Sequence, residues 1–159
     1  PFFLDRRAPV TGQAGLIAYD CHVQAELDHN GEAKTVFGVS VPVTTLCPCS
    51  KEMSDYGAHN QRSIVSVHWR CTESIWLEHM IELIESQGSA PIYSLLKRPD
   101  EKFVTEQAYD HPKFVEDMVR DITAKLREDE RVVWFRVESE NEESIHTHNA
   151  YALIEEERA

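Results

Sequence analysis

The sequence lacks any long hydrophobic run, and this absence limits where the protein can work. No window comes near the roughly 18 consecutive apolar residues that a spanning helix needs, so we predict no membrane segment. No basic stretch followed by an apolar run and a small-residue cleavage site is present either. Because four cysteines occur without such a signal, we expect a reducing, cytoplasmic compartment.

Basic side chains are also scarce. The 159 residues carry 16 Lys and Arg against 28 Asp and Glu, a formal net charge of −12. Nucleic-acid binding depends on clusters of Lys and Arg, so this balance argues against a nucleic-acid partner. It still permits one small anionic ligand, held by a few local cations or by a metal ion.

Stretches of alternating apolar and polar residues predict β-strands. The first stretch has Ile17, Tyr19, Val23 and Leu27 on its inward side, and a turn at 28–31 joins it to the second stretch as a hairpin. The predicted strands cover residues 15–27, 35–43, 64–71, 131–138 and 150–154.

Two helices are predicted between the third and fourth strands. Thr72 caps the first and Asp110 caps the second, with apolar residues at helical spacing in both. Between them, residues 89–110 are typical of an irregular loop broken by two prolines, and a loop of that length suggests a function. From residue 34 onward the order is ββααββ, which predicts an α+β fold: an antiparallel sheet with a helix pair on one face.

The periodicity stops between residues 44 and 63, where residues suited to chemistry gather. Cys47 and Cys49 flank a proline that limits the freedom of both thiols. Thiolates bind zinc and similar ions, and His59 is a further candidate ligand. The alternative is that both cysteines are small buried residues at a strand end.

A second cluster lies in the segment 143–148. If this segment is extended, His146 and His148 point to the same side and converge on one ion; the alternative is a pair of surface histidines. Three protein ligands plus a water would make a hydrolytic site, whereas four, such as Cys47 and Cys49 with both histidines, would make a closed structural site. The spacing leaves both possibilities open.

The predicted loop at 89–110 mixes charges of both signs. Glu101 offers a carboxylate ligand, while Lys97 and Arg98 are suited to a phosphate, although a solvated charged loop explains the same residues. Glu116 lies off the apolar stripe of its helix, and the pattern alone predicts an exposed glutamate.

Several long motifs lie along the chain. They are LCPCSKE at 46–52, DYGAHNQRS at 55–63, YSLLKRPDEK at 93–102, KFVEDMVRD at 113–121, and VESEN at 137–141 with SIH at 144–146. As a set they resemble the signature of the type IB GTP cyclohydrolase family, and the similarity runs from Pro1 to about Ile154.

The resemblance implies a tunnelling fold, in which ββααββ units pair and assemble into barrels. Members of the family carry two such units per chain and form homotetramers with active sites between subunits. On this interpretation residues 34–159 are a complete second unit, and residues 1–33 are the last strands of a first unit whose beginning is missing.

The resemblance also implies a reaction: hydrolysis of GTP to 7,8-dihydroneopterin triphosphate and formate, the first step of tetrahydrofolate biosynthesis. The implied metal ligands are Cys47, Glu101 and His146, with zinc or manganese as the ion, and water held by the metal attacks guanine C8. One rival is an archaeal-type relative that forms a cyclic phosphate. The other is a non-catalytic, metal-stabilised oligomerisation module.

The remaining roles implied by the resemblance concern proton transfer and substrate binding. His59 and His148 are the implied proton carriers, Glu143 matches an active-site position, and Glu116 matches the carboxylate that anchors the guanine edge. The triphosphate needs local cations in so acidic a chain. The candidates are Lys51, Arg62, Lys97 and Arg98.

Overall fold

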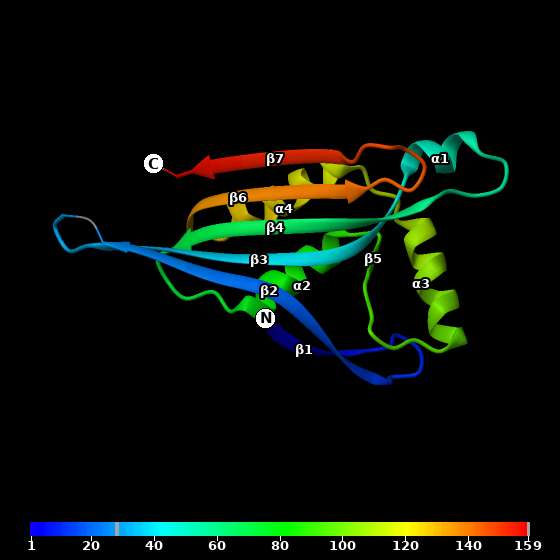
Figure 1. Cartoon of the computed structure of the whole chain (residues 1–159), viewed down its shortest axis with the longest axis horizontal. Coiled ribbons are helices and arrows are strands. Elements are labelled where there is room, and N and C mark those ends of the chain that lie inside the picture. The colour runs from blue at the N-terminus through cyan, green and yellow to red at the C-terminus, as the bar shows by residue number, and fades with distance from the viewer. Residues whose placement is uncertain (28, 159) are drawn as a thin grey trace.

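The computed structural model describes residues 1–27 and 29–158, and within them one antiparallel sheet has helices against one face (Figure 1). The strands lie in the order β1-β2-β3-β4-β6-β7, and the short β5 pairs with β3. The predicted α+β class and antiparallel sheet are confirmed. In chain order the elements are β1 (Phe2–Arg7), β2 (Ala14–Leu27), β3 (Ala33–Leu46), α1 (Pro48–Met53), β4 (Asn60–Cys71), α2 (Leu77–Gln87), β5 (Ala90–Pro91), α3 (Arg98–Asp110), α4 (Val115–Glu128), β6 (Val132–Glu142) and β7 (Ala150–Glu157).

The five predicted strands are all present, most of them longer than predicted. β2 and β3 form the predicted hairpin, and Gly31 in its turn has the positive φ that glycine accepts readily, while Asp28 lies outside the described residues. The inward, buried face of β2 is shorter than predicted. Ile17 and Tyr19 are buried, but Val23 is 61% and Leu27 75% exposed, because the hairpin extends past the helices (Figure 1).

The predicted helix from Thr72 begins later, at Leu77. The Thr72 backbone N–H donates to the Arg131 carbonyl at 2.9 Å, so the chain continues beside the neighbouring strand before it turns into α2. Met80, Ile81 and Ile84 of its predicted apolar stripe are buried against the sheet, whereas Trp76, expected on the same stripe, precedes the helix and is 69% exposed.

The irregular loop predicted for 89–110 is wrong, because residues 98–110 form α3. Pro99 lies in the first turn, where its missing N–H costs nothing, and Asp100 accepts the Lys97 backbone N–H at 2.9 Å. Asp110 ends α3 and caps no helix: the following residue precedes Pro112, and α-helical geometry is disfavoured there. The second predicted helix therefore begins at Val115, as α4.

The core fills the space between the sheet and the helix pair α2 and α4 (Figure 1). Alternate residues of β3, β4 and β6 face the helices, and the largest of them, Trp69 and Phe135, are fully buried. α4 contributes Met118, Ile122 and Leu126, spaced four residues apart on one stripe. This packing fixes the ends of the strands, and the residues of the candidate site lie at those ends.

A buried polar cluster ties β1 and β2 to α2. The Tyr19 hydroxyl donates to the Glu85 carboxylate, and Arg6 forms an ion pair with the other oxygen of Glu85 at 2.6 Å. Tyr19 is 1% and Glu85 7% exposed. Burial, reinforced by the bond to Glu85, raises the pKa of Tyr19 to about 12. A buried carboxylate with two partners is a strong anchor, whereas one deprived of a partner destabilises the fold.

Replacing Tyr19 with Phe should lower the free energy of unfolding by about 1–3 kcal/mol near neutral pH, because a buried carboxylate loses a hydrogen bond. Since the pKa of Tyr19 is raised from 10.0 to about 12, its contribution is complete below pH 10 and is lost as the pH rises to 12. The difference between wild type and variant should therefore shrink over that range in urea titrations. Tyr56→Phe, at a fully exposed tyrosine, is the control; equal behaviour of the two variants would contradict the role of Tyr19.

Candidate functional site

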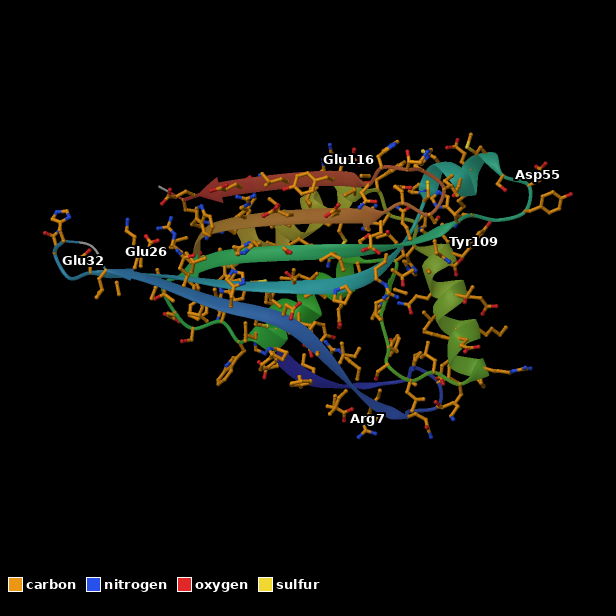
Figure 2. The ribbon with its side chains drawn as sticks, in the orientation of Figure 1. Arg7, Glu26, Glu32, Asp55, Tyr109 and Glu116 are labelled. Atoms are coloured by element: carbon orange, nitrogen blue, oxygen red, sulfur yellow. The ribbon has the colours of Figure 1, made fainter. Side chains whose placement is uncertain are left out.

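A cavity of about 300 Å³ opens at the end of the sheet where α1, the start of α4 and the β6–β7 loop meet. Figure 2 shows side chains crowded at this end, on the side of Asp55 and Tyr109 and away from Glu26 and Glu32. A larger hollow of about 550 Å³ lies on the helix-free face of the sheet, and no predicted site residue lines it. The smaller cavity is lined by Cys47, Pro48, Cys49, His59, Gln61, Lys113, Phe114, Val115, Glu116, Asn141, Glu143, His146, His148 and Ala150.

Cys47 occupies the turn from β3 into α1. Its backbone is extended, and Pro48 begins the helix, which suits the fixed φ of proline. The Cys47 sulfur accepts the Ser50 backbone N–H at 3.5 Å and so caps α1. Cys47 is half-buried and Cys49 exposed, and neither forms a disulfide. The short helix was not predicted, because residues 44–63 show no periodicity.

His59 lies beside Cys47 because the chain closes on itself between them. The Cys47 backbone N–H donates to the His59 carbonyl at 3.2 Å. The Ser50 hydroxyl donates to the Cys47 carbonyl at 3.0 Å and accepts the His59 N–H at 3.3 Å. The His59 ring reaches across to the β6–β7 loop, where Nδ1 lies 2.9 Å from the Ser144 hydroxyl. A thiol and an imidazole are thus fixed at one wall of the cavity.

The β6–β7 loop also lines the cavity, with Glu143, His146 and His148. The segment is not the extended strand on which the convergence of the histidines depended, since β7 begins only at Ala150. The two rings nevertheless stack, with centroids 5.3 Å apart and planes inclined by 26°. The loop is closed by Asn149, which accepts the Glu143 N–H at 3.3 Å and donates to Glu140 at 2.9 Å.

Buried polar residues lie at the strand ends that meet the cavity, and our sequence analysis missed them. Ser63 donates to Asn141 at 2.6 Å, and Thr45 lies 2.7 Å from Ser63, so Thr45 is the donor of that second bond. Gln61 is 8% and Asn141 2% exposed, and both line the cavity. The missed signal was polar residues on the inward side of strands that are otherwise apolar there.

Glu116 comes from the first turn of α4 and is exposed at the cavity. The helix start is held in place by Lys113, whose backbone N–H donates to the Leu46 carbonyl at 3.0 Å. The Lys113 side chain pairs with Asp121 at 2.6 Å. Because the N-terminus of a helix favours negative charge, this position suits a carboxylate.

The sequence model of one protein family, described as type I GTP cyclohydrolase folE2, matches residues 1–152. The chain belongs to this family. A protein named GTP cyclohydrolase FolE2 from Geotalea uraniireducens is 56% identical over 99% of the chain, and one of that name from Thermotoga neapolitana is 53% identical over 98%. The chain spans 58% and 59% of those two proteins. The family match supports the resemblance to type I GTP cyclohydrolases, but its description does not include the finer subdivision IB.

In this FolE2 family member the predicted active-site residues fall into two groups. Cys47, His59, Glu116, Glu143, His146 and His148 share the cavity, together with Cys49. The others lie elsewhere. Lys97, Arg98 and Glu101 begin α3, whereas the opposite end of α3, at Tyr109, contacts Lys51. At 1.5 Å per residue, Glu101 is about 12 Å from Tyr109 along the helix.

Two of the predicted cations are also separated from the cavity interior. The Lys51 ammonium donates to the Tyr109 carbonyl and lies 4.3 Å from the centre of the Tyr109 ring. Arg62 follows the inward-facing Gln61 on β4, so its exposed side chain is on the opposite, helix-free face of the sheet.

The donor atoms in the cavity suit a zinc-like ion, because a thiol and imidazoles are the ligands such ions prefer. Among residues 1–27 and 29–158, however, no three Cys, His, Asp or Glu residues are already arranged around one point. The cavity thus has the right ligand types in an open arrangement.

No helix within residues 1–27 and 29–158 is long and apolar enough to cross a membrane.

Proposed function

We propose that this chain carries the active site of GTP cyclohydrolase I, which converts GTP and water to 7,8-dihydroneopterin triphosphate and formate in tetrahydrofolate biosynthesis. The observation that carries the proposal is the single cavity that Cys47, His59, His146 and His148 line together. Opening a purine ring needs an activated water and groups that move protons, and this set supplies both. Membership of the FolE2 family supports the same reaction. A cytoplasmic location is part of the proposal.

Cys47 and His146 would hold a divalent ion, zinc or manganese, at the cavity wall. Cys47 is well placed because its backbone is fixed by the α1 turn, so its sulfur is presented in one orientation. When bound, such an ion supplies Lewis acidity and brings water toward ionisation near neutral pH. Glu101 is the third proposed ligand. It begins α3, about 12 Å along the helix from the contact with α1, so we propose that it comes from a neighbouring subunit.

Glu116 would orient the substrate. Guanine presents N1–H and the N2 amino group as parallel donors, and a carboxylate accepts both at once. Glu116 lines the cavity that also holds Cys47, so a purine held by its pyrimidine edge would extend its imidazole ring toward the thiol.

His59 and His148 would move protons during ring opening and formate release, because imidazole exchanges protons near neutral pH. Glu143 is half-buried in the same cavity and would accept a proton or orient a histidine. Because the rings of His146 and His148 stack, a substitution of either residue also affects the other.

The triphosphate requires cations beyond Lys113, the one Lys or Arg among the described residues that line this cavity, because its ammonium already pairs with Asp121. Lys51 is one candidate, on the helix that carries Cys49. Lys97, Arg98 and Arg62 face other directions, so we propose that they act on the cavity of a neighbouring subunit in a homotetramer built from tunnelling-fold barrels. Pairing of subunits would then bring both Glu101 and the cations to the substrate.

A non-catalytic closed metal site is the second candidate, because Cys49 lines the same cavity as Cys47, His146 and His148. Four protein ligands would leave no position for water. In that case Cys49→Ala and His148→Ala should abolish metal binding while Glu101→Ala leaves it intact. The cyclohydrolase proposal expects the reverse for Cys49 and Glu101.

The primary test is turnover of GTP by the full-length protein, stripped with chelator and reloaded with zinc or manganese, with pterin fluorescence measured after oxidation. We expect activity that depends on the ion and falls at least about 100-fold in Cys47→Ala, since even indirect metal partners change activity by 10–100-fold. Cys21→Ala, at a thiol on β2, is the matched control. Chromatography of the product separates the triphosphate from a cyclic phosphate. A metal-loaded protein without turnover would contradict the proposal.

Glu116→Gln should lower kcat/KM for GTP about 100-fold, because an amide replaces one acceptor with a donor against the guanine edge. Glu128→Gln at the other end of α4 is the control and should leave kcat/KM unchanged. The measurement is initial rate against GTP concentration. Equal kcat/KM for the two variants would exclude Glu116 from substrate recognition.

Co-expression of Cys47→Ala and Glu101→Ala chains tests whether a site is shared between subunits. Each variant alone should be inactive, while mixed oligomers should regain about a quarter of wild-type activity, because random assembly unites an intact Cys47 with an intact Glu101 at that frequency. Cys47→Ala mixed with His146→Ala is the control without recovery, since both residues belong to the cavity of one chain. Recovery no greater than in this control would place Glu101 outside a shared site.

A further inference from the structure

Ser144 makes the one described hydrogen bond to the His59 ring. The backbone of His59 is held separately, by Cys47 and Ser50, so those contacts leave the side-chain torsions free. Ser144 Oγ lies 2.9 Å from Nδ1, across a sequence separation of 85 residues. Among residues 1–27 and 29–158 the other ring nitrogen, Nε2, has no hydrogen-bond partner. The hydroxyl therefore occupies one edge of the imidazole and leaves the other without a described partner.

The Ser144 hydroxyl is not needed to close its own loop. Asn149 already joins the two ends of that loop, through Glu143 and Glu140. Ser144 itself is exposed, and its neighbour Ile145 is 66% exposed, so neither belongs to the core. The contact with His59 is the one described hydrogen bond of this hydroxyl. Its effect is therefore directed at the ring rather than at the fold.

We propose that Ser144 is a positioning residue that acts through His59. By occupying Nδ1 it fixes the orientation of the ring, so that Nε2 is the nitrogen left free for the substrate. Ser144 does not touch the substrate. This inference rests on the proposed function, because the positioning has a catalytic purpose only if His59 moves protons in GTP ring opening.

The test compares Ser144→Ala, Ser144→Thr and Thr147→Ala in the full-length protein. Ser144→Thr keeps a hydroxyl at the position, and Thr147→Ala removes an exposed hydroxyl from the same loop as a matched control. The first measurement is the nitrogen-15 NMR spectrum of the histidine rings without GTP. We expect the His59 ring nitrogens to give the same chemical shifts in wild type, Ser144→Thr and Thr147→Ala, and the Nδ1 signal to shift in Ser144→Ala because its hydrogen bond is lost.

The second measurement is the steady-state rate with GTP. Ser144→Ala should lower kcat about 10-fold with little change in KM, as expected for a residue that orients a catalytic group, and Ser144→Thr should restore most of it. An unchanged His59 signal, or an unchanged kcat in an active protein, would overturn the inference. If the wild type has no turnover, the proposed function fails, while the NMR comparison still decides whether Ser144 positions His59.

Discussion

The pairing of β3 with β4 is the constraint on which the site depends. Its last register pair joins Leu46 to Asn60, so the next residues outward, Cys47 and His59, leave the sheet side by side. Their backbone hydrogen bond continues the ladder by one step, and α1 with its following loop is confined to the segment between them. A thiol and an imidazole twelve positions apart thus become neighbours through strand register alone. The side-chain bonds of Ser50 then fix a geometry that the register has already brought about.

Register also explains why polar residues are buried beneath the cavity. A slip of one residue would turn Gln61 to the helix-free face and bring Arg62 toward the core, which would bury an unpaired charge. The hydrogen-bonded series from Thr45 through Ser63 to Asn141 spans three adjacent strands and is satisfied only in the observed register. Such a network favours one alignment over its neighbours, because each alternative leaves buried groups without partners. The same residues that fix the alignment form part of the cavity surface.

The predictable parts of the structure were those with a simple repeat. Alternation located every long strand, and the spacing of Met118, Ile122 and Leu126 located the buried stripe of α4. Two helix ends were wrong at prolines: Pro99, interpreted as a break, begins a helix, and Pro112, expected in the first turn of a helix, lies between two of them.

The chemical types of the residues predicted the lining of the cavity better than the periodicity of the sequence did. The thiol and imidazole types that suit a metal do share it, whereas Gln61 and Asn141 were missed because both lie beyond the ends of the predicted strands. Spacing carries no information on whether Glu101 serves its own cavity or another, since that depends on the surfaces that meet. The burial of Val23 and Leu27 was predicted wrongly for the same reason. Their alternation indicates an apolar face, but it does not show which surface covers that face.

Electrostatics explain why the residues that line the cavity and the cations proposed to bind the triphosphate lie on different elements. The chain carries 28 acidic and 16 basic side chains, so a triphosphate approaching it meets a repulsive average field. Gathering cations beside Cys47 within one chain would also bring them close to a bound metal ion, and like charges in a cavity repel strongly. Placing Lys97, Arg98 and Arg62 on other elements avoids this repulsion until subunits meet. In the proposed assembly the donors that perform the chemistry are fixed by the β3–β4 register, while the charges that attract the substrate are contributed by separate surfaces. The two functions then depend on different contacts and respond to different substitutions.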